Sequence, residues 1–332
     1  MIKVSVVVPV YNTASYLDRC LRSLVGQTLR ELEIVAIDDG SDDGSAEILA
    51  AYAAQYPERF VCRRQENAGQ GAARNLALQL CSGEYVGFLD SDDFARPEAF
   101  EKLYSAAAEQ DADYVACGYT DLLIKNGKET VLRPYVASGV AGEPKELFFD
   151  ALVSPFLHLY RRDLLQRSGA AFPEGLIYED TAFYLELLPH IRRIAVIEEA
   201  LVCRVRHGGS TMSTITAQRV AQIFPVLGAA LAYYRENGFL AAYGQELTAF
   251  CVRILLCSSM NRISQVQSLR ERHALVDRTL AFLKENFPAY RGNPYLQKGL
   301  KNRYLRSIGP LTGRMACALM RLRCRLGPPY VR

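Results

Sequence analysis

Four polar residues, Asp90-Ser91-Asp92-Asp93, directly follow the apolar segment Tyr85–Leu89. Carboxylates this close repel one another, so their charged forms are costly unless a cation or hydrogen-bond donors compensate. Oxygen ligands of this type suit Mg²⁺ or Mn²⁺ bridging a diphosphate. The same residues could instead begin a helix, because acids favour a helix N-terminus and Pro97 suits a first helical turn. The cluster indicates a divalent-cation site or a helix start.

A second acidic pair, Asp38-Asp39, is followed by Gly40-Ser41. These residue types are common in turns. A carboxylate at this place could also accept a hydrogen bond from the N–H of a pyrimidine base or from a ribose hydroxyl. Both interpretations stay open.

The segment Glu66–Asn75 is rich in glycine and precedes a helical pattern. Its Arg74 could bind an anion or a base, or it could pair with a neighbouring acid. A dinucleotide-binding fingerprint needs glycine or alanine where Arg74 stands, and it follows a first strand rather than a third. These departures disfavour a Rossmann-type dehydrogenase.

Two further groups could carry chemistry. Glu179-Asp180 opens a helical pattern, where acids favour the helix dipole and where a fixed carboxylate could act as a general base toward a hydroxyl. His207 follows Arg204 and Arg206 in a polar loop and could ligate a metal or contact a phosphate, with the arginines as anion partners.

These groups need a scaffold, and the first 120 residues alternate strand and helix patterns. We expect strands at 3–10, 33–37, 60–62, 85–89 and 113–117 with helices between them, which predicts an α/β fold with a doubly wound, mostly parallel sheet. The carboxyl ends of such strands meet at one edge. Residues Tyr11, Asp39 and Asp90 should therefore face one crevice.

The pattern changes after residue 119. We expect a hairpin of 119–124 and 129–133 around Asn126-Gly127, a strand at 194–206, and helices beyond Ser213. This predicts a catalytic domain over 1–212, a helical region over 213–300 and a tail over 301–332.

Charge is distributed unevenly along the 332 residues, whose formal net charge is +3. The last 32 residues hold eight basic side chains and no acid, which leaves −5 for the rest. Within the tail, apolar residues at helical spacing form one stripe: Leu311, Met315, Leu319, Leu322 and Leu326. Arg314, Arg321 and Arg325 lie on one flank of this stripe and Arg323 on the other. A membrane-surface helix and a terminal helix packed on the body both fit.

Composition limits the location and the partners. The nine cysteines include no C-x-x-C pair, which predicts reduced thiols, and no signal peptide or uninterrupted apolar run of about 18 residues is found. We expect a cytoplasmic protein, peripheral on the inner face of the cell membrane, that does not bind nucleic acid.

Four segments in this order resemble the family 2 glycosyltransferases, inverting nucleotide-sugar-dependent enzymes of the GT-A fold: 4–45, 66–78, 83–93 and 172–188. The resemblance covers residues 1–212. The stretch from Arg206 to Met212 is similar to bacterial hexosyltransferases that build capsule, exopolysaccharide or cell-wall glycans.

The resemblance implies a role for each matching residue. Asp180 would be the general base and Glu179 beside it would hold a sugar. Asp92 of the D-x-D motif would bind Mn²⁺ or Mg²⁺, together with Asp90 and, by a looser match, His207. The residues implied to bind the nucleotide sugar are Pro9, Tyr11, Asp39, Arg74, Asp90 and Ser91.

The implied reaction moves a sugar from a UDP-sugar to a hydroxyl of a glycan or lipid-linked glycan. Processive members carry a Q-x-x-R-W motif, and this chain has no Trp, so we expect one or a few additions. Alternatives are a polyprenol-phosphate sugar synthase, which needs no base, and a nucleotide-binding scaffold without turnover. A nucleotidyltransferase is disfavoured because the glycine- and basic-rich loop after its first strand is absent.

Overall fold

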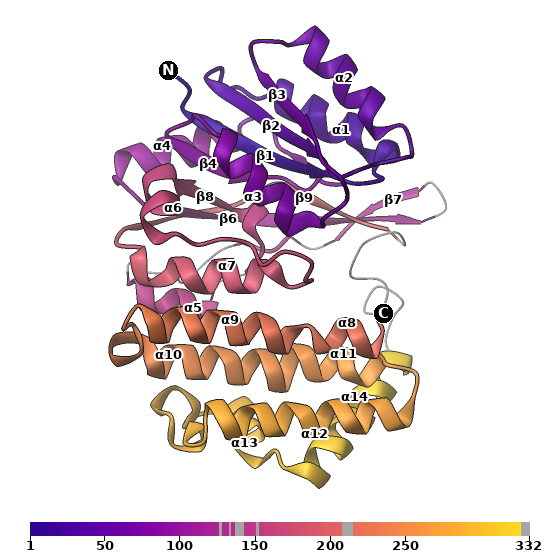
Figure 1. Ribbon diagram of the computed structural model, residues 1–332, viewed down its shortest axis with the longest axis vertical. Helices are drawn as coiled ribbons and strands as arrows, with labels where there is room; N and C mark the ends of the chain where they lie inside the picture. Colours follow the sequence, from indigo (N-terminus) through magenta and orange to yellow (C-terminus); the bar gives the residue numbers. More distant parts are fainter. Residues whose placement is uncertain (126–127, 133, 137–142, 151–152, 208–214, 327–332) are drawn as a thin grey trace. The chain divides into compact units, whose positions relative to one another are not determined.

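The computed structural model describes residues 1–125, 128–132, 134–136, 143–150, 153–207 and 215–326 (Figure 1). The chain forms two compact units, Met1–Gly208 and Gly209–Arg332. The domain boundary expected at residue 212 lies outside the described residues, as does the Asn126-Gly127 turn.

The N-terminal unit begins with the parallel strands that the β-branched runs predict. They lie in the order β3-β2-β1-β4 and comprise β1 (Val4–Val10), β2 (Leu32–Asp38), β3 (Phe60–Arg64) and β4 (Tyr85–Phe88). Both faces are covered by helices α1 (Ala14–Val25), α2 (Ser45–Gln55), α3 (Gln70–Leu80) and α4 (Ala99–Glu109). Val6 and Val8 share a core with Leu17 of α1 and Leu103 of α4, while α3 lies on the face toward the viewer (Figure 1).

Strand β1 extends further than β4 at the carboxyl edge of the sheet. Of β1, residues Val4–Val7 pair with β4, and Leu89 N–H donates the last bond to Val7 O. Strand β1 continues to Val10, so Pro9 lies beyond the end of β4 and its missing N–H breaks no ladder bond. The chain after β4 then turns away, and this turn holds Asp90–Asp93.

The rest of the sheet differs from the expectation. It adds five strands: β5 (Phe94–Ala95), β6 (Tyr114–Lys125), β7 (Lys128–Val131), β8 (His158–Arg161) and β9 (Ile194–Arg206). Their order in the sheet is β4-β8-β6-β9-β5, and β7 pairs with β6. The separate strands expected at 113–117 and 119–124 are one strand, β6, with a register shift around Gly118. A Cβ at Gly118 would lie 2.2 Å from Tyr135 O, so glycine marks an irregularity of the strand here and not its end.

Three short helices complete this unit: α5 (Leu147–Asp150), α6 (Arg162–Ser168) and α7 (Glu179–Leu187). Helix α7 is covered by aromatic residues of the core, since Phe183 stacks on Phe172 with 3.9 Å between ring centroids. This packing fixes the position of the acidic pair at the start of α7.

The C-terminal unit is helical, as predicted. Its helices are α8 (Ala217–Ala221), α9 (Ile223–Glu236), α10 (Leu240–Arg253), α11 (Met260–Gln265), α12 (Leu269–Asn286), α13 (Leu300–Ser307) and α14 (Pro310–Leu326). A π-helical segment, Ile254–Ser259, joins α10 to α11.

The helix Leu240–Gln265 is, within the described residues, the one stretch long and apolar enough to cross a membrane by length and composition. Because it contains Glu246 and Arg253, a search of the sequence for uninterrupted apolar runs does not detect it. Core helices of globular proteins pass the same test, and Leu247, Phe250 and Met260 of this helix are buried in the protein.

Candidate active site

The residues that follow β1 and β4 contact each other at the edge of the sheet. Thr13 Oγ1 donates a 2.9 Å hydrogen bond to the buried Ser91 Oγ. Asp90 Oδ1 accepts bonds from Gln70 Nε2 at 3.0 Å and from Arg74 Nη2 at 2.8 Å. The crevice beside β1 and β4 therefore contains Asp90 and Ser91, as expected from their places at the strand end.

Arg74 links this edge to helix α7. Its side chain is buried, with Nη2 on Asp90 and Nη1 donating to Glu179 Oε1 at 2.6 Å. Glu179 is itself buried. A buried cation between two carboxylates is strongly held, because removing either partner leaves an uncompensated charge. The structure thus places Arg74 and Glu179 together, whereas the resemblance implied a contact of Arg74 with the nucleotide base.

Gly71 allows α3 to approach α7 closely enough for this link. A Cβ on Gly71 would lie 2.8 Å from Pro173 O, 3.3 Å from Phe172 Cβ and 3.4 Å from Glu179 Cγ. The backbone of 172–173 would have to move to admit it. The glycine-rich segment is therefore also a packing surface for the acidic helix start.

Substitution of Gly71 by alanine is expected to lower the free energy of unfolding by about 1–3 kcal/mol, because it overpacks this contact. Urea unfolding followed by circular dichroism measures the change. Gly228→Ala in helix α9 is the matched control, since nothing lies within 4 Å of a Cβ there and alanine should raise stability by about 1 kcal/mol. Equal unfolding midpoints for Gly71→Ala and the wild type would contradict the packing role.

Asp180 lies one residue after Glu179 and is partly exposed. Its Oδ1 accepts a 3.3 Å bond from Thr181 Oγ1. Burial, and next the charge of Glu179, raise the pKa of Asp180 from 3.8 to about 7, although Arg74 opposes the shift. A carboxyl with a pKa near neutrality, open to solvent on one side, can take a proton from a bound hydroxyl.

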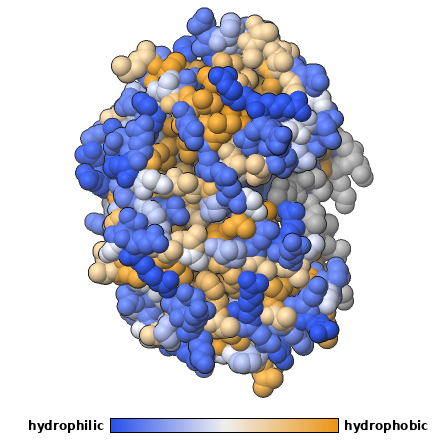
Figure 2. All heavy atoms as spheres, in the orientation of Figure 1, coloured by the Kyte–Doolittle hydropathy of each residue, from blue (hydrophilic) through white to orange (hydrophobic). Residues whose placement is uncertain are grey.

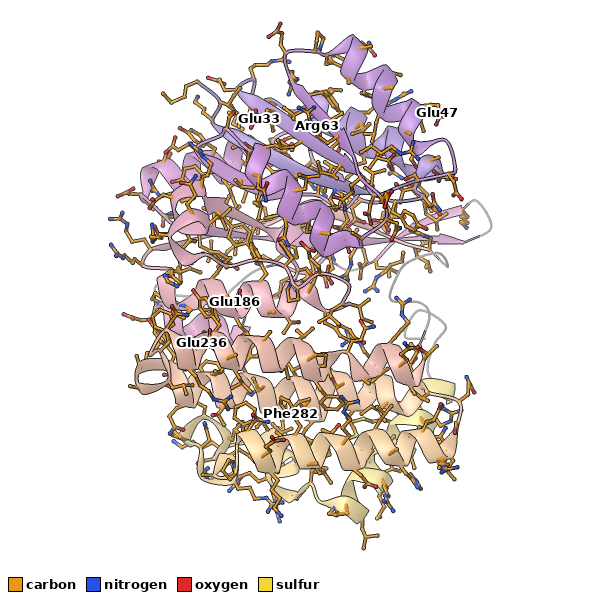
Figure 3. The ribbon with its side chains drawn as sticks, in the orientation of Figure 1. Glu33, Glu47, Arg63, Glu186, Glu236 and Phe282 are labelled. Atoms are coloured by element: carbon orange, nitrogen blue, oxygen red, sulfur yellow. The ribbon has the colours of Figure 1, made fainter. Side chains whose placement is uncertain are left out.

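A second carboxyl of α7 shares the raised pKa but has another environment. Glu186, labelled in Figure 3, has a pKa raised to about 7 by burial, and its Oε2 accepts from Ala171 N–H at 3.4 Å. No described contact joins it to Arg74 or Asp90. A raised pKa alone therefore does not identify Asp180 as the candidate base. Asp180 differs from Glu186 because it is next to Glu179, which Arg74 joins to Asp90.

Asp92 and Asp93 form the other end of the acidic turn, and His207, which follows β9, lies beside Asp92. His207 Nε2 lies 2.9 Å from Asp92 Oδ2, and the His207 ring stacks on Tyr16 with centroids 4.3 Å apart. Asp93 is buried and accepts a 2.7 Å bond from Val205 N–H of β9. This bond positions the end of β9 and hence His207 beside Asp92.

Asp90, Asp92 and His207 are the residues that the resemblance implies for a divalent cation. Burial, and next Asp90, raise the pKa of Asp92; burial, Asp92 and Asp90 raise that of Asp93 well above its usual range. Within the described residues, no three His, Cys, Asp or Glu side chains could hold a metal together. A cation here would therefore need one or two of these carboxylates plus substrate phosphates, a coordination common for Mg²⁺.

Asp39, which the resemblance implies for the nucleotide, holds the loop that follows β3. This buried carboxylate accepts from Gln65 Nε2 at 2.7 Å and from the N–H groups of Ala68 and Gly69 at 2.9 Å each, so it fixes the glycine-rich loop. Pro9 is buried within β1, whereas Tyr11 is 51% exposed and open to stacking with a ring.

Arg204 and Arg206, which the sequence offers as anion partners beside His207, both bind Asp121 of β6 in the structure. Arg204 Nε donates at 2.7 Å and Arg206 Nε at 3.2 Å to Asp121 Oδ1. Parallel pairing of β6 with β9 sets Asp121 opposite Arg204, which the sequence pattern does not reveal.

The comparisons with known proteins agree with this architecture. The family model described as glycosyl transferase family 2 matches residues 5–169. The chain is 30% identical to EpsH of Bacillus subtilis (strain 168), which is assigned as a glycosyltransferase, over 98% of this chain and 92% of EpsH.

Two solved structures share the fold. The crystal structure of S. aureus TarS 1-349 in complex with UDP-GlcNAc has a TM-score of 0.73 at 23% identity, covering 99% of this chain and 93% of that one. The mannosyltransferase PcManGT from Pyrobaculum calidifontis, in complex with GDP-Man and Mn²⁺, has a TM-score of 0.52 at 18% identity, covering 96% and 87%. The predicted fold class is confirmed. This chain belongs to glycosyl transferase family 2.

Proposed function

We propose that this glycosyltransferase moves a sugar from a UDP-sugar to a hydroxyl of a glycan or lipid-linked glycan, with inversion, in the synthesis of a bacterial surface polysaccharide. The observation that carries the proposal is the chain of contacts from Asp90 through Arg74 to Glu179, which brings Asp180 to the acidic edge of the sheet. A base and a diphosphate-binding edge are the two parts that this transfer needs.

Asp180 acts as the base in this mechanism. Its carboxylate takes the proton of the acceptor hydroxyl as that oxygen attacks the anomeric carbon from the face opposite the nucleotide. The bond from the sugar to the diphosphate breaks as the new glycosidic bond forms. Burial, and next the charge of Glu179, raise the pKa of Asp180 to about 7, and Arg74 holds Glu179 in place.

Asp92 would hold a divalent cation, with Asp90 and His207 beside it. The residues of the D-x-D motif would supply oxygen ligands, and the imidazole of His207, 2.9 Å from Asp92, would be a further donor. A bound Mn²⁺ or Mg²⁺ would neutralise charge on the departing diphosphate. The Mn²⁺ in the PcManGT complex supports this choice of metal.

The nucleotide is proposed to be uridine diphosphate. TarS, which has the same fold, was solved with UDP-GlcNAc. In this proposal the exposed Tyr11 would stack on the base and Asp39 would accept from it. Pro9, Arg74 and Ser91 complete the proposed nucleotide-sugar set. We further propose that the enzyme acts at the inner face of the cell membrane, because residues 301–332 are strongly basic.

Thermal shift with UDP, GDP and CDP tests the donor class. A ligand that binds only the folded state raises the melting temperature by mass action. We expect a rise with UDP, enlarged by Mn²⁺, and no comparable rise with GDP or CDP. A rise with GDP or CDP alone would contradict the uridine assignment, and no rise with any nucleotide would favour a scaffold without a donor.

A further inference from the structure

Helix α14 exposes its apolar face. Leu311, Met315, Leu319 and Leu322 are 75%, 64%, 66% and 54% exposed. Their spacing of four, four and three residues places them on one side of the helix, and Ala318 on the same side is exposed too. We call these four large residues the α14 stripe. A helix at the surface of a globular protein normally turns such a stripe toward the core.

The opposite side of α14 is well packed, so the exposure of the stripe does not reflect a loose helix. Cys317 is buried, and a Cβ on Gly313 would lie 3.1 Å from Val276 Cγ1 of α12. Arg314 pairs with Asp277 at 2.6 Å, and Arg321 Nη1 donates to Ser264 O and Val266 O at 2.8 Å. Arg314 and Arg321, two of the arginines that flank the stripe, therefore attach α14 to its own unit.

The segment of the chain that holds the stripe is basic. Residues 301–332 hold eight basic side chains and no acid. Of these, Lys301, Arg303 and Arg323 are exposed, and Arg323 lies on α14 itself. An apolar helix face flanked by basic residues complements a surface that is apolar inside and anionic outside.

A second copy of this chain fits the stripe less well. A symmetric pair formed through α14 would set the same basic segment against itself on both sides. Like charges brought together across an interface oppose association. Charge complementarity therefore favours an anionic lipid surface over self-association.

We propose that the α14 stripe inserts into the headgroup region of an anionic lipid bilayer and docks the enzyme on it. Leu311, Met315, Leu319 and Leu322 enter the boundary between headgroups and acyl chains, and Arg323 contacts lipid phosphates. Figure 2 shows apolar residues among hydrophilic ones on the surface of the C-terminal unit.

Co-sedimentation of the full chain with phosphatidylcholine vesicles, with and without phosphatidylglycerol, tests the proposal. We expect binding to the vesicles that contain phosphatidylglycerol, weakened by added salt because salt screens the charges. Leu319→Gln and Leu322→Gln should each reduce the partition coefficient about tenfold, and Arg323→Gln about fivefold.

Leu269→Gln is the matched control, because Leu269 of α12 is 58% exposed and lies outside the stripe. It should bind vesicles like the wild type. Equal binding by the stripe variants and the wild type, or equal binding to both vesicle types, would overturn the proposal. The proposal would also be overturned if the wild type did not bind vesicles and instead formed a dimer in sedimentation velocity, and if the Leu319→Gln variant were monomeric. Vesicle binding needs no turnover, so this result is independent of the proposed reaction.

Discussion

Replacement of Asp180 by asparagine is expected to reduce sugar transfer by about 10³-fold and to leave UDP binding unchanged. Asparagine keeps the size of the side chain and cannot accept the acceptor's proton, and a positioned general base contributes on the order of 10²–10⁴-fold. UDP release with and without acceptor measures transfer, and the UDP thermal shift measures binding. Loss of both together would indicate a structural role instead.

The stability of Asp180→Asn separates the two roles further. The pKa of Asp180 is raised from 3.8 to about 7, so the folded state binds a proton that the unfolded state has released. Its contribution to stability is present below pH 3.8 and is lost as the pH rises through about 7. Asparagine carries no charge, so the variant should resist urea better than the wild type above pH 7. A lower urea midpoint would contradict this account.

Glu186→Gln is the matched control for Asp180→Asn. Glu186 lies on the same helix and shares a pKa of about 7, but it does not contact Arg74 in the described structure. Transfer should persist in Glu186→Gln. If Glu186→Gln lost transfer while Asp180→Asn retained it, the base would be misassigned. Undiminished transfer by Asp180→Asn to a lipid phosphate would favour a polyprenol-phosphate sugar synthase.

Replacement of Asp92 by alanine is expected to lower transfer by roughly 10²–10³-fold, the usual loss when one group that stabilises a developing charge is removed. The change removes a proposed cation ligand and the partner of His207. The Mn²⁺-dependent part of the UDP thermal shift should disappear with it, because the cation would connect the protein to the diphosphate.

The control for Asp92→Ala is Asp163→Ala, whose exposed carboxylate pairs with Arg167 within helix α6. It removes the same charge from the same unit and should keep both transfer and the Mn²⁺ effect. A Mn²⁺-dependent shift that survives in Asp92→Ala would exclude Asp92 as the principal ligand. Transfer by the wild type in the presence of a strong chelator would exclude metal dependence altogether.

The sequence predicts the parallel half of the fold well. Continuous runs such as Val4–Val10 and Leu32–Asp38 are buried on both faces, and their β-branched residues make the pattern unambiguous. The other half is harder to predict. Strands β5 and β8 have two and four residues, which is too short for a strand pattern to be recognised in the sequence. Gly118 interrupts the pattern of β6 without ending the strand.

The candidate site could be predicted only in part for a similar reason. Acidic residues at strand ends can be found from sequence, because strand direction alone brings them to one edge. The link from Arg74 to Glu179 joins residues 105 positions apart and depends on Gly71. Tyr16 and Gln70, which contact His207 and Asp90, stand in ordinary helical patterns that carry no signal of those contacts.

The most direct test of the central claim is the pH dependence of sugar transfer for the wild type and Asp180→Asn. If Asp180 is the base, the wild-type rate should fall about tenfold for each pH unit below its pKa of about 7, because only the ionised carboxyl accepts a proton. Asp180→Asn should show a low rate without this acidic limb. A variant that keeps both the rate and the limb of the wild type would contradict the assignment of Asp180 as the base.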